Sequence, residues 1–117
     1  MQYMLLIFSD PKSFQALSDS QRNEALAAFG AYGEALQKAG AMRDGNRLRP
    51  ADTATTVRLQ SGKAQVLNGP FADTREQLGG YYLIDVPDLD AALSWAARCP
   101  GASFGAVEVR PVWPMGE

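Results

Sequence analysis

Acidic and basic side chains come together at two places in the chain, and neither place offers a familiar catalytic apparatus. The first is the segment Asp73-Thr74-Arg75-Glu76, and the second is the pair Glu108 and Arg110. A carboxylate can exchange a proton with a substrate, and a guanidinium can hold an anion. The 117 residues include no His and one Cys, which excludes a Ser-His-Asp triad, a Cys-His pair and a Cys/His zinc cluster. We therefore expect no cofactor and no metal site, and any chemistry would be metal-free proton transfer by Glu76, Asp73 or a tyrosine.

A turn and a charged segment adjoin each other in the middle of the chain, and each has two interpretations. Asn68-Gly69-Pro70-Phe71 is typical of a connecting turn, in which Gly gives backbone freedom and Pro rigidity, and the alternative is a ligand-contacting loop. In the charged segment, Asp73 can cap a helical turn while Arg75 pairs weakly at the surface. Alternatively, Glu76 lies at the rim of a pocket and Arg75 holds an anion. We favour the structural interpretation of the charged segment, because exposed charges rarely have a function.

The alternation of the last strand places Glu108 and Arg110 on one face and Val107 and Val109 on the other. If the valines face the helices, the two charges face a second subunit. There they form either an interface salt bridge or the polar lining for a small anionic ligand, and both alternatives stay open. Tyr81, Tyr82, Trp95 and Trp113 are interpreted first as core or interface packing groups, and of these four only Tyr81 joins the candidates. The candidate ligand-binding residues are Asn68, Gly69, Pro70, Phe71, Asp73, Arg75, Glu76, Tyr81, Glu108 and Arg110.

Two further features are interpreted as structural. Arg43, Arg47 and Arg49 form a short basic cluster, which we interpret as an exposed edge because no wider basic stripe accompanies it. Cys99 has no activating base nearby in the sequence, so we expect a buried, structural thiol.

The elements that must position these side chains follow the order β-α-β, a hairpin, then β-α-β. Ser18 and Gln21 match a helix capping box, and Asp88 is a good cap for a second helix. A hairpin is expected around Ser61-Gly62, where two alternating runs meet. The expected strands are 3–8, 41–48, 55–59, 64–67, 80–86 and 104–109, and the expected helices run from Ser18 to Gly40 and from Asp88 to Cys99.

This order predicts a single α+β domain over residues 1–117, a ferredoxin-like sandwich with an extra β-hairpin. The strand 3–8 is apolar on both faces, with Tyr3, Leu5 and Ile7 on one side. Two helices can cover only one face of the sheet. A second copy of the sheet is the simplest cover for the other face, so we expect a homodimer.

The segment Asn-Gly-Pro-Phe-Ala-Asp-Thr-Arg-Glu-Gln-Leu-Gly-Gly-Tyr-Tyr, residues 68–82, resembles the DGPF-domain branch of the YCII-related proteins. The similarity extends to the opening strand 1–8, to residues 83–92 and to the closing strand 105–111. The resemblance implies a ferredoxin-like fold that pairs as a dimeric α+β barrel. In the wider superfamily a His-Asp pair has been proposed as catalytic. This chain has no His, and Asn68 stands where that branch has Asp.

The resemblance implies an uncharacterised YCII/DGPF-type function, and we expect a small anionic or aromatic molecule to bind in a cleft of the dimer. Any reaction would be lyase- or isomerase-like proton transfer. The alternative is a non-catalytic accessory protein in extracytoplasmic-function sigma-factor signalling, because many members of the branch are encoded beside such sigma factors. A net charge of -2 argues against sequence-independent binding to nucleic acid. The apolar run 4–8 is too short for a signal peptide or a membrane span, so we expect a cytoplasmic protein without membrane contact.

Overall fold

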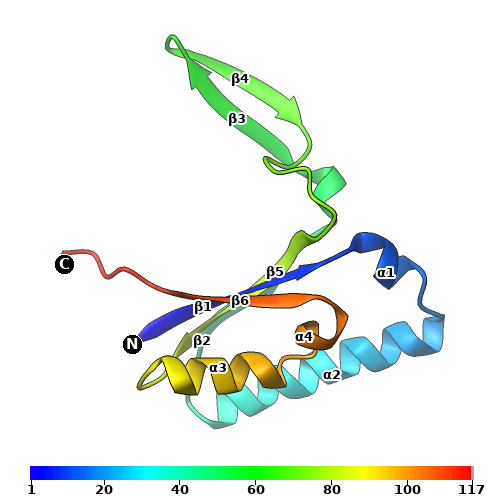
Figure 1. Ribbon diagram of the computed structural model, residues 1–117, viewed down its shortest axis with the longest axis vertical. Helices are drawn as coiled ribbons and strands as arrows, with labels where there is room; N and C mark the ends of the chain where they lie inside the picture. Colours follow the sequence, from blue (N-terminus) through cyan, green and yellow to red (C-terminus); the bar gives the residue numbers. More distant parts are fainter. Residues whose placement is uncertain (117) are drawn as a thin grey trace.

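Four antiparallel strands form one sheet in the order β2-β5-β1-β6 (Figure 1). The structure is a computed structural model that describes residues 1–116. The central strand β1 (Gln2–Ser9) pairs with β5 (Gln77–Asp85) on one side and with β6 (Ala106–Pro111) on the other. The edge strand β2 (Met42–Arg47) pairs with β5. A helix follows β1 and another follows β5, so the expected ferredoxin-like α+β sandwich is confirmed.

The two long helices cover the same face of the sheet (Figure 1). Helix α2 (Asp19–Lys38) begins at the predicted capping box, in which Ser18 Oγ accepts a hydrogen bond from Gln21 N and Gln21 Oε1 accepts one from Ser18 N. Helix α3 (Leu89–Arg98) begins at Asp88, whose carboxylate accepts from Ala91 N as expected. Leu5, Leu36 and Ile84 lie completely buried between the helices and the sheet. Burial of apolar side chains of this size stabilises the fold by about 1.5–3 kcal/mol each.

Helix α3 packs on the sheet through alanines and not through its leucines. About half of the side chain is exposed in both Leu89 and Leu93. Ala92 and Ala96 are buried instead. These small side chains let α3 lie close to the sheet, so the leucines are left at its flank.

Two short helices, α1 (Pro11–Gln15) and α4 (Gly101–Phe104), are absent from the sequence prediction. Because Phe104 belongs to α4, the last strand begins at residue 106 and not at 104 as predicted. The helical turn expected at Asp73 does not form, since residues 69–76 contain neither helix nor strand. The chain there spans the distance from the hairpin back to β5, which favours an extended path.

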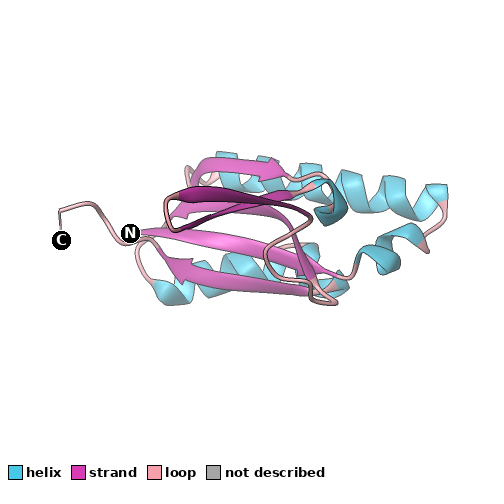
Figure 2. Ribbon diagram, turned by 90° about the horizontal axis from the view of Figure 1, so that it is seen from above, coloured by secondary structure: helices cyan, strands magenta, loops and turns pink. Residues whose placement is uncertain are grey.

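The predicted hairpin forms and stands apart from the sheet. Strands β3 (Thr55–Gln60) and β4 (Lys63–Asn68) pair only with each other, after a short 3₁₀ turn η1 (Ala51–Thr53). Ser61 and Gly62 have φ values of +51° and +78°, which a two-residue type I′ turn requires. We call residues 55–68 the arm. Figures 1 and 2 show that the arm rises on the side of the sheet opposite the long helices and leans over the strands.

The helix-free face of the sheet carries the two charges of the last strand, as the alternation predicts. Val107 and Val109 pack against the core beneath the sheet. Glu108 and Arg110 lie on the opposite face, beside Leu6 and Met4 of β1, and form an ion pair with each other. Within residues 1–116, no helix is long and apolar enough to cross a membrane.

Candidate ligand cavity

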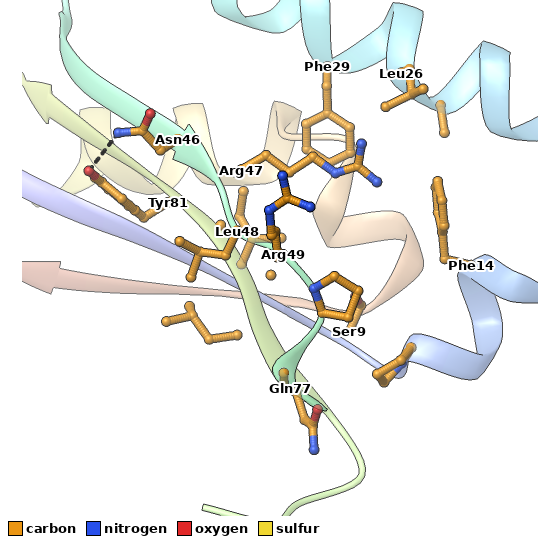
Figure 3. Close-up of a pocket in the computed structure, with 18 of the residues that line it drawn as sticks. Ser9, Phe14, Leu26, Phe29, Asn46, Arg47, Leu48, Arg49, Gln77 and Tyr81 are labelled. Atoms are coloured by element: carbon orange, nitrogen blue, oxygen red, sulfur yellow. Dashed lines mark hydrogen bonds between the residues drawn. The ribbon is translucent and has the colours of Figure 1, made fainter. Parts of the chain in front are cut away.

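A cavity of about 370 Å³ lies at one end of the sheet, on the side of α1 and α2 (Figure 3). The first turns of α2 run past the end of the sheet, and α1 lies beside them (Figure 1). The cavity lies between these two helices and the ends of β1, β2 and β5, and we call it the main cavity. Its volume is within the range of about 300–1,000 Å³ that is usual for sites of small organic molecules.

Aromatic and aliphatic side chains form one wall of the cavity. Phe29 and Leu26 come from α2, where Phe29 continues the helical stripe that packs against the core. Phe14 comes from α1, which begins with Asp10 as its cap and Pro11 as its first residue. Arg22 Nη2 donates a hydrogen bond of 2.9 Å to the carbonyl of Gln15, and this contact fixes α1 against α2. Figure 3 shows Phe14, Leu26 and Phe29 around one open space.

Two arginines at the end of β2 face this wall. The guanidinium carbon of Arg47 lies 5.5 Å from the centroid of the Phe14 ring, and Arg49 lines the same cavity. Figure 3 shows both guanidinium groups pointing into the space beside Phe29. Among the described residues 1–116, ion pairs involve other cations, and neither Arg47 nor Arg49 has a carboxylate partner. The cavity therefore combines stacking surfaces with two guanidinium groups that can hold an anion.

A hydrogen-bonded tyrosine lies at the margin of the cavity. Asn46 Nδ2 donates to the Tyr81 hydroxyl at 2.9 Å, and this hydroxyl donates to Asp44 Oδ2 at 3.2 Å. Tyr81 and Asn46 line the cavity. Figure 3 shows the pair displaced from the aromatic wall. A tyrosine paired with a carboxylate is the kind of group that can move a proton.

The candidate residues from the sequence fall into three groups. Tyr81 lines the cavity described above. Pro70 and Phe71 line a second cavity of about 490 Å³ between the base of the arm and the helix-free face, which also includes Phe8. We call it the corner cavity. The candidates that line neither cavity are Asn68, Gly69, Asp73, Arg75, Glu76, Glu108 and Arg110.

The turn at residues 68–71 fastens the base of the arm. Gly69 N donates to the carbonyl of Ala54 at 2.7 Å, and Thr56 Oγ1 donates to the carbonyl of Gly69 at 2.8 Å. The φ of Gly69 is +119°, which favours glycine. The guanidinium of Arg58 lies 4.8 Å from the Phe71 ring centroid. These contacts support the structural interpretation of the turn.

Arg75 pairs at the surface, as the structural interpretation predicts. Its Nε lies 3.2 Å from Asp10 Oδ2, and its side chain is 88% exposed. The pKa of Asp10 is lowered, first by the hydrogen bond from Lys12 N and then by the one from Arg75. The cap of α1 therefore stays charged at neutral pH.

Sequence reasoning missed the residues that line the main cavity. The basic cluster lies on and just after the exposed edge strand β2, as interpreted, and Arg43 Nη2 lies 3.4 Å from Asp85 Oδ2. The interpretation did not include a cavity beside this edge. Arg47 and Arg49 converge on the cavity. One signal was present in the sequence: Asp10-Pro11 is typical of a helix start, and it would have located the turn that carries Phe14.

We expect Asn68→Asp to be nearly neutral. Asn68 is exposed at the end of β4 and lines neither cavity. A surface substitution of this kind changes the free energy of unfolding by about 0.5 kcal/mol or less. Thermal unfolding of both proteins and titration with the same aromatic anion test this. A tenfold change in affinity would return Asn68 to the site.

Cys99 should resist modification in the folded protein. Its side chain is 1% exposed, and burial raises the pKa of its thiol, which lowers the fraction of reactive thiolate at neutral pH. We expect N-ethylmaleimide to react about a hundredfold more slowly with the native protein than with the urea-unfolded protein, because reaction requires opening. Mass spectrometry against time measures both rates. Equal rates would contradict the placement.

The fold and the cavity describe a ferredoxin-like α+β protein with a site suited to a small ligand. The chain belongs to the YCII family, since the model of the YCII-related domain matches residues 1–116. An uncharacterised protein of Rhizobium meliloti (strain 1021) is 37% identical over 114 residues, covering 96% of this chain and 92% of the relative.

A solved structure shares the fold. It is 5-chloro-2-hydroxyhydroquinone dehydrochlorinase (TftG) from Burkholderia phenoliruptrix AC1100, in complex with 2,5-dihydroxybenzoquinone. The TM-score is 0.56 at 20% identity, and the alignment covers 99% of this chain and 96% of TftG. At this identity the similarity shows the fold alone.

Proposed function

We propose that this protein binds a small aromatic anion in the cavity between α1, α2 and the end of the sheet. The observation that carries the proposal is the convergence of Arg47 and Arg49, both without a carboxylate partner among residues 1–116, beside Phe14 and Phe29. A planar ring stacks on phenyl and guanidinium surfaces, and its acidic oxygens accept hydrogen bonds from the guanidinium groups. The ligand of TftG, a dihydroxylated quinone, belongs to this chemical class.

For a reaction on such a ligand, we propose metal-free proton transfer of the lyase or isomerase type. Tyr81 is the candidate group, because its hydroxyl has Asp44 as a proton acceptor and the residue lies at the margin of the cavity. The other candidates from the sequence, Asp73 and Glu76, lie in an exposed loop outside the cavity. We expect Tyr81→Phe to leave ligand affinity within about threefold and to remove any turnover, since one general acid or base contributes about 10²–10⁴-fold. A parallel loss of affinity would instead assign Tyr81 to binding alone.

We further propose that the protein is a cytoplasmic homodimer. Met4, Leu6 and Phe8 leave apolar surface partly exposed on the helix-free face, and a second sheet would cover it. The cytoplasm is the compartment in which an unpaired thiol stays reduced. The second candidate function is a non-catalytic accessory role through protein contacts, and the exposed apolar side chains of the arm favour it.

Calorimetric titration with 2,5-dihydroxybenzoquinone tests the binding proposal. We expect saturable binding, and we expect neutral 2,5-dimethoxybenzoquinone to bind at least tenfold more weakly, because it lacks the charge that Arg47 and Arg49 would hold. Benzoate serves as a second anion of similar size. Equal affinities for the charged and neutral quinones, or no binding of either anion, would overturn the proposal and favour the accessory role.

A further inference from the structure

The arm exposes apolar side chains that nothing in residues 1–116 covers. Val57 and Val66 face each other across the hairpin, and they are 59% and 61% exposed. Leu59 is 75% exposed on the same face. A hairpin of two strands is marginally stable in water without a surface to pack against. A surface outside its own chain would therefore stabilise the arm.

The solvent-accessible area of the chain is larger than that of a compact monomer of the same mass. The chain exposes 8185 Å². A compact monomer of its mass, 12.6 kDa, is expected to expose about 6,200 Å². The radius of gyration, 16.2 Å, also exceeds the roughly 13 Å expected for a compact chain of this length. The excess of about 2,000 Å² is larger than the roughly 800 Å² per partner of a standard interface.

The position of the arm suits a second copy of the same chain. The arm rises from the end of the sheet on its helix-free side, so the arm and that face together form an L (Figures 1 and 2). Met4, Leu6 and Phe8 supply partly exposed apolar groups on the other limb of the L. In a dimer with a two-fold axis, the arm of each chain can contact the sheet of the other chain, which gives a self-complementary interface.

Charge also favours this partner. The arm carries Arg58 and Lys63 and no carboxylate, which gives it a net charge of +2. Because the whole chain has a net charge of -2, the rest of the chain has -4. On the helix-free face, Asp44 has an exposed side chain next to the Tyr81 hydroxyl. A basic arm and an acidic body attract each other between two copies.

We propose that the arm of each chain packs against the sheet of a second copy, so that two chains hold each other reciprocally. The partner then covers Val57, Leu59 and Val66, and it closes the corner cavity, which opens between the arm and the helix-free face beside Phe8. The arm is in this way a dedicated dimerisation element, in addition to the contact between the two sheet faces.

Sedimentation equilibrium of the double variant Val57→Glu/Val66→Glu tests the proposal. We expect a dimer for the wild type and a dissociation constant about a hundredfold higher for the variant, because central apolar contacts dominate interface energies. The matched control is Leu89→Glu/Leu93→Glu, which adds the same charge to exposed leucines of α3 and should keep the dimer. A monomeric wild type, or a variant as dimeric as the control, would overturn the proposal.

A second measurement does not depend on the folding of a double variant. Gln65, an exposed residue of the arm, is replaced as Gln65→Cys, and the new thiol carries a spin label. This spin-labelled protein, without ¹⁵N, is mixed with ¹⁵N-labelled wild type. The buried Cys99 leaves the new thiol as the reactive one. We expect broadening of amide signals from the ¹⁵N-labelled chain at Met4, Leu6 and Leu83. Unbroadened signals in a sample shown to be dimeric would exclude contact between the arm and the partner's sheet.

Discussion

Replacing both cavity arginines, as Arg47→Gln/Arg49→Gln, is expected to weaken the binding of 2,5-dihydroxybenzoquinone by about a hundredfold or more. A hydrogen bond to a charged group contributes roughly 1.5–3 kcal/mol, so losing two of them corresponds to at least about 3 kcal/mol. Both side chains are largely exposed to the cavity or solvent, and neither belongs to the buried core. The free energy of unfolding should therefore change little. Calorimetric titration and thermal unfolding measure the two quantities.

The matched control is Arg43→Gln. Arg43 lies on β2, before the other two arginines in the chain, and carries the same charge, but its guanidinium pairs with Asp85 and it does not line the cavity. The control should bind the quinone within about twofold of the wild type, since a lost surface ion pair contributes only about 0–1 kcal/mol. If the control weakened binding as much as the double variant, general electrostatic attraction would replace the cavity as the explanation.

Gly105→Ala is expected to cause the largest loss of stability. A Cβ at Gly105 would lie 2.1 Å from the carbonyl oxygen of Phe8 and 3.0 Å from Ser9 Cα. These are backbone atoms of β1, so α4 and β6 would have to move away from the central strand. Overpacking of this kind costs about 1–3 kcal/mol and more where the backbone must move. For a chain of this length the melting temperature should fall by roughly 10 °C.

Gly30→Ala tests whether the loss comes from this close approach. Gly30 lies within α2, and a Cβ there would have no neighbour within 4 Å. Alanine in a helix interior is favoured over glycine by about 0.5–1 kcal/mol, so the control should raise the melting temperature. Chemical denaturation of both variants gives the free energies of unfolding. A stable Gly105→Ala protein would contradict the packing of β6 against β1.

The parts of the fold that local chemistry determines could be predicted from the sequence. The capping box at Ser18 and the turn at Ser61-Gly62 depend on residues within a few positions of one another. The alternation of the last strand likewise separates its valines from Glu108 and Arg110. Local patterns could not predict the direction of the arm, because it depends on the turns before Thr55 and after Asn68 and not on the hairpin itself.

The cavity could not be predicted for a related reason. Phe14, Phe29 and Arg47 come from three elements, and only the packing of α1 against α2 brings them together. The motif at residues 68–71 is prominent in the sequence, yet it fastens the arm and lies outside the main cavity. The prominent loop motif thus has a structural role at the base of the arm. The cavity residues Phe14, Phe29 and Arg47 lie in sequence segments outside that motif.

Mapping of the bound ligand by chemical-shift perturbation tests the central claim most directly. The ¹⁵N-labelled protein is titrated with 2,5-dihydroxybenzoquinone, and the amide signals that move are assigned to residues. We predict the largest shifts at Phe14, Phe29 and Arg47, with saturation at the affinity that calorimetry gives. Shifts confined to the corner cavity around Phe71, or a spectrum that the ligand leaves unchanged, would contradict the assignment of the site.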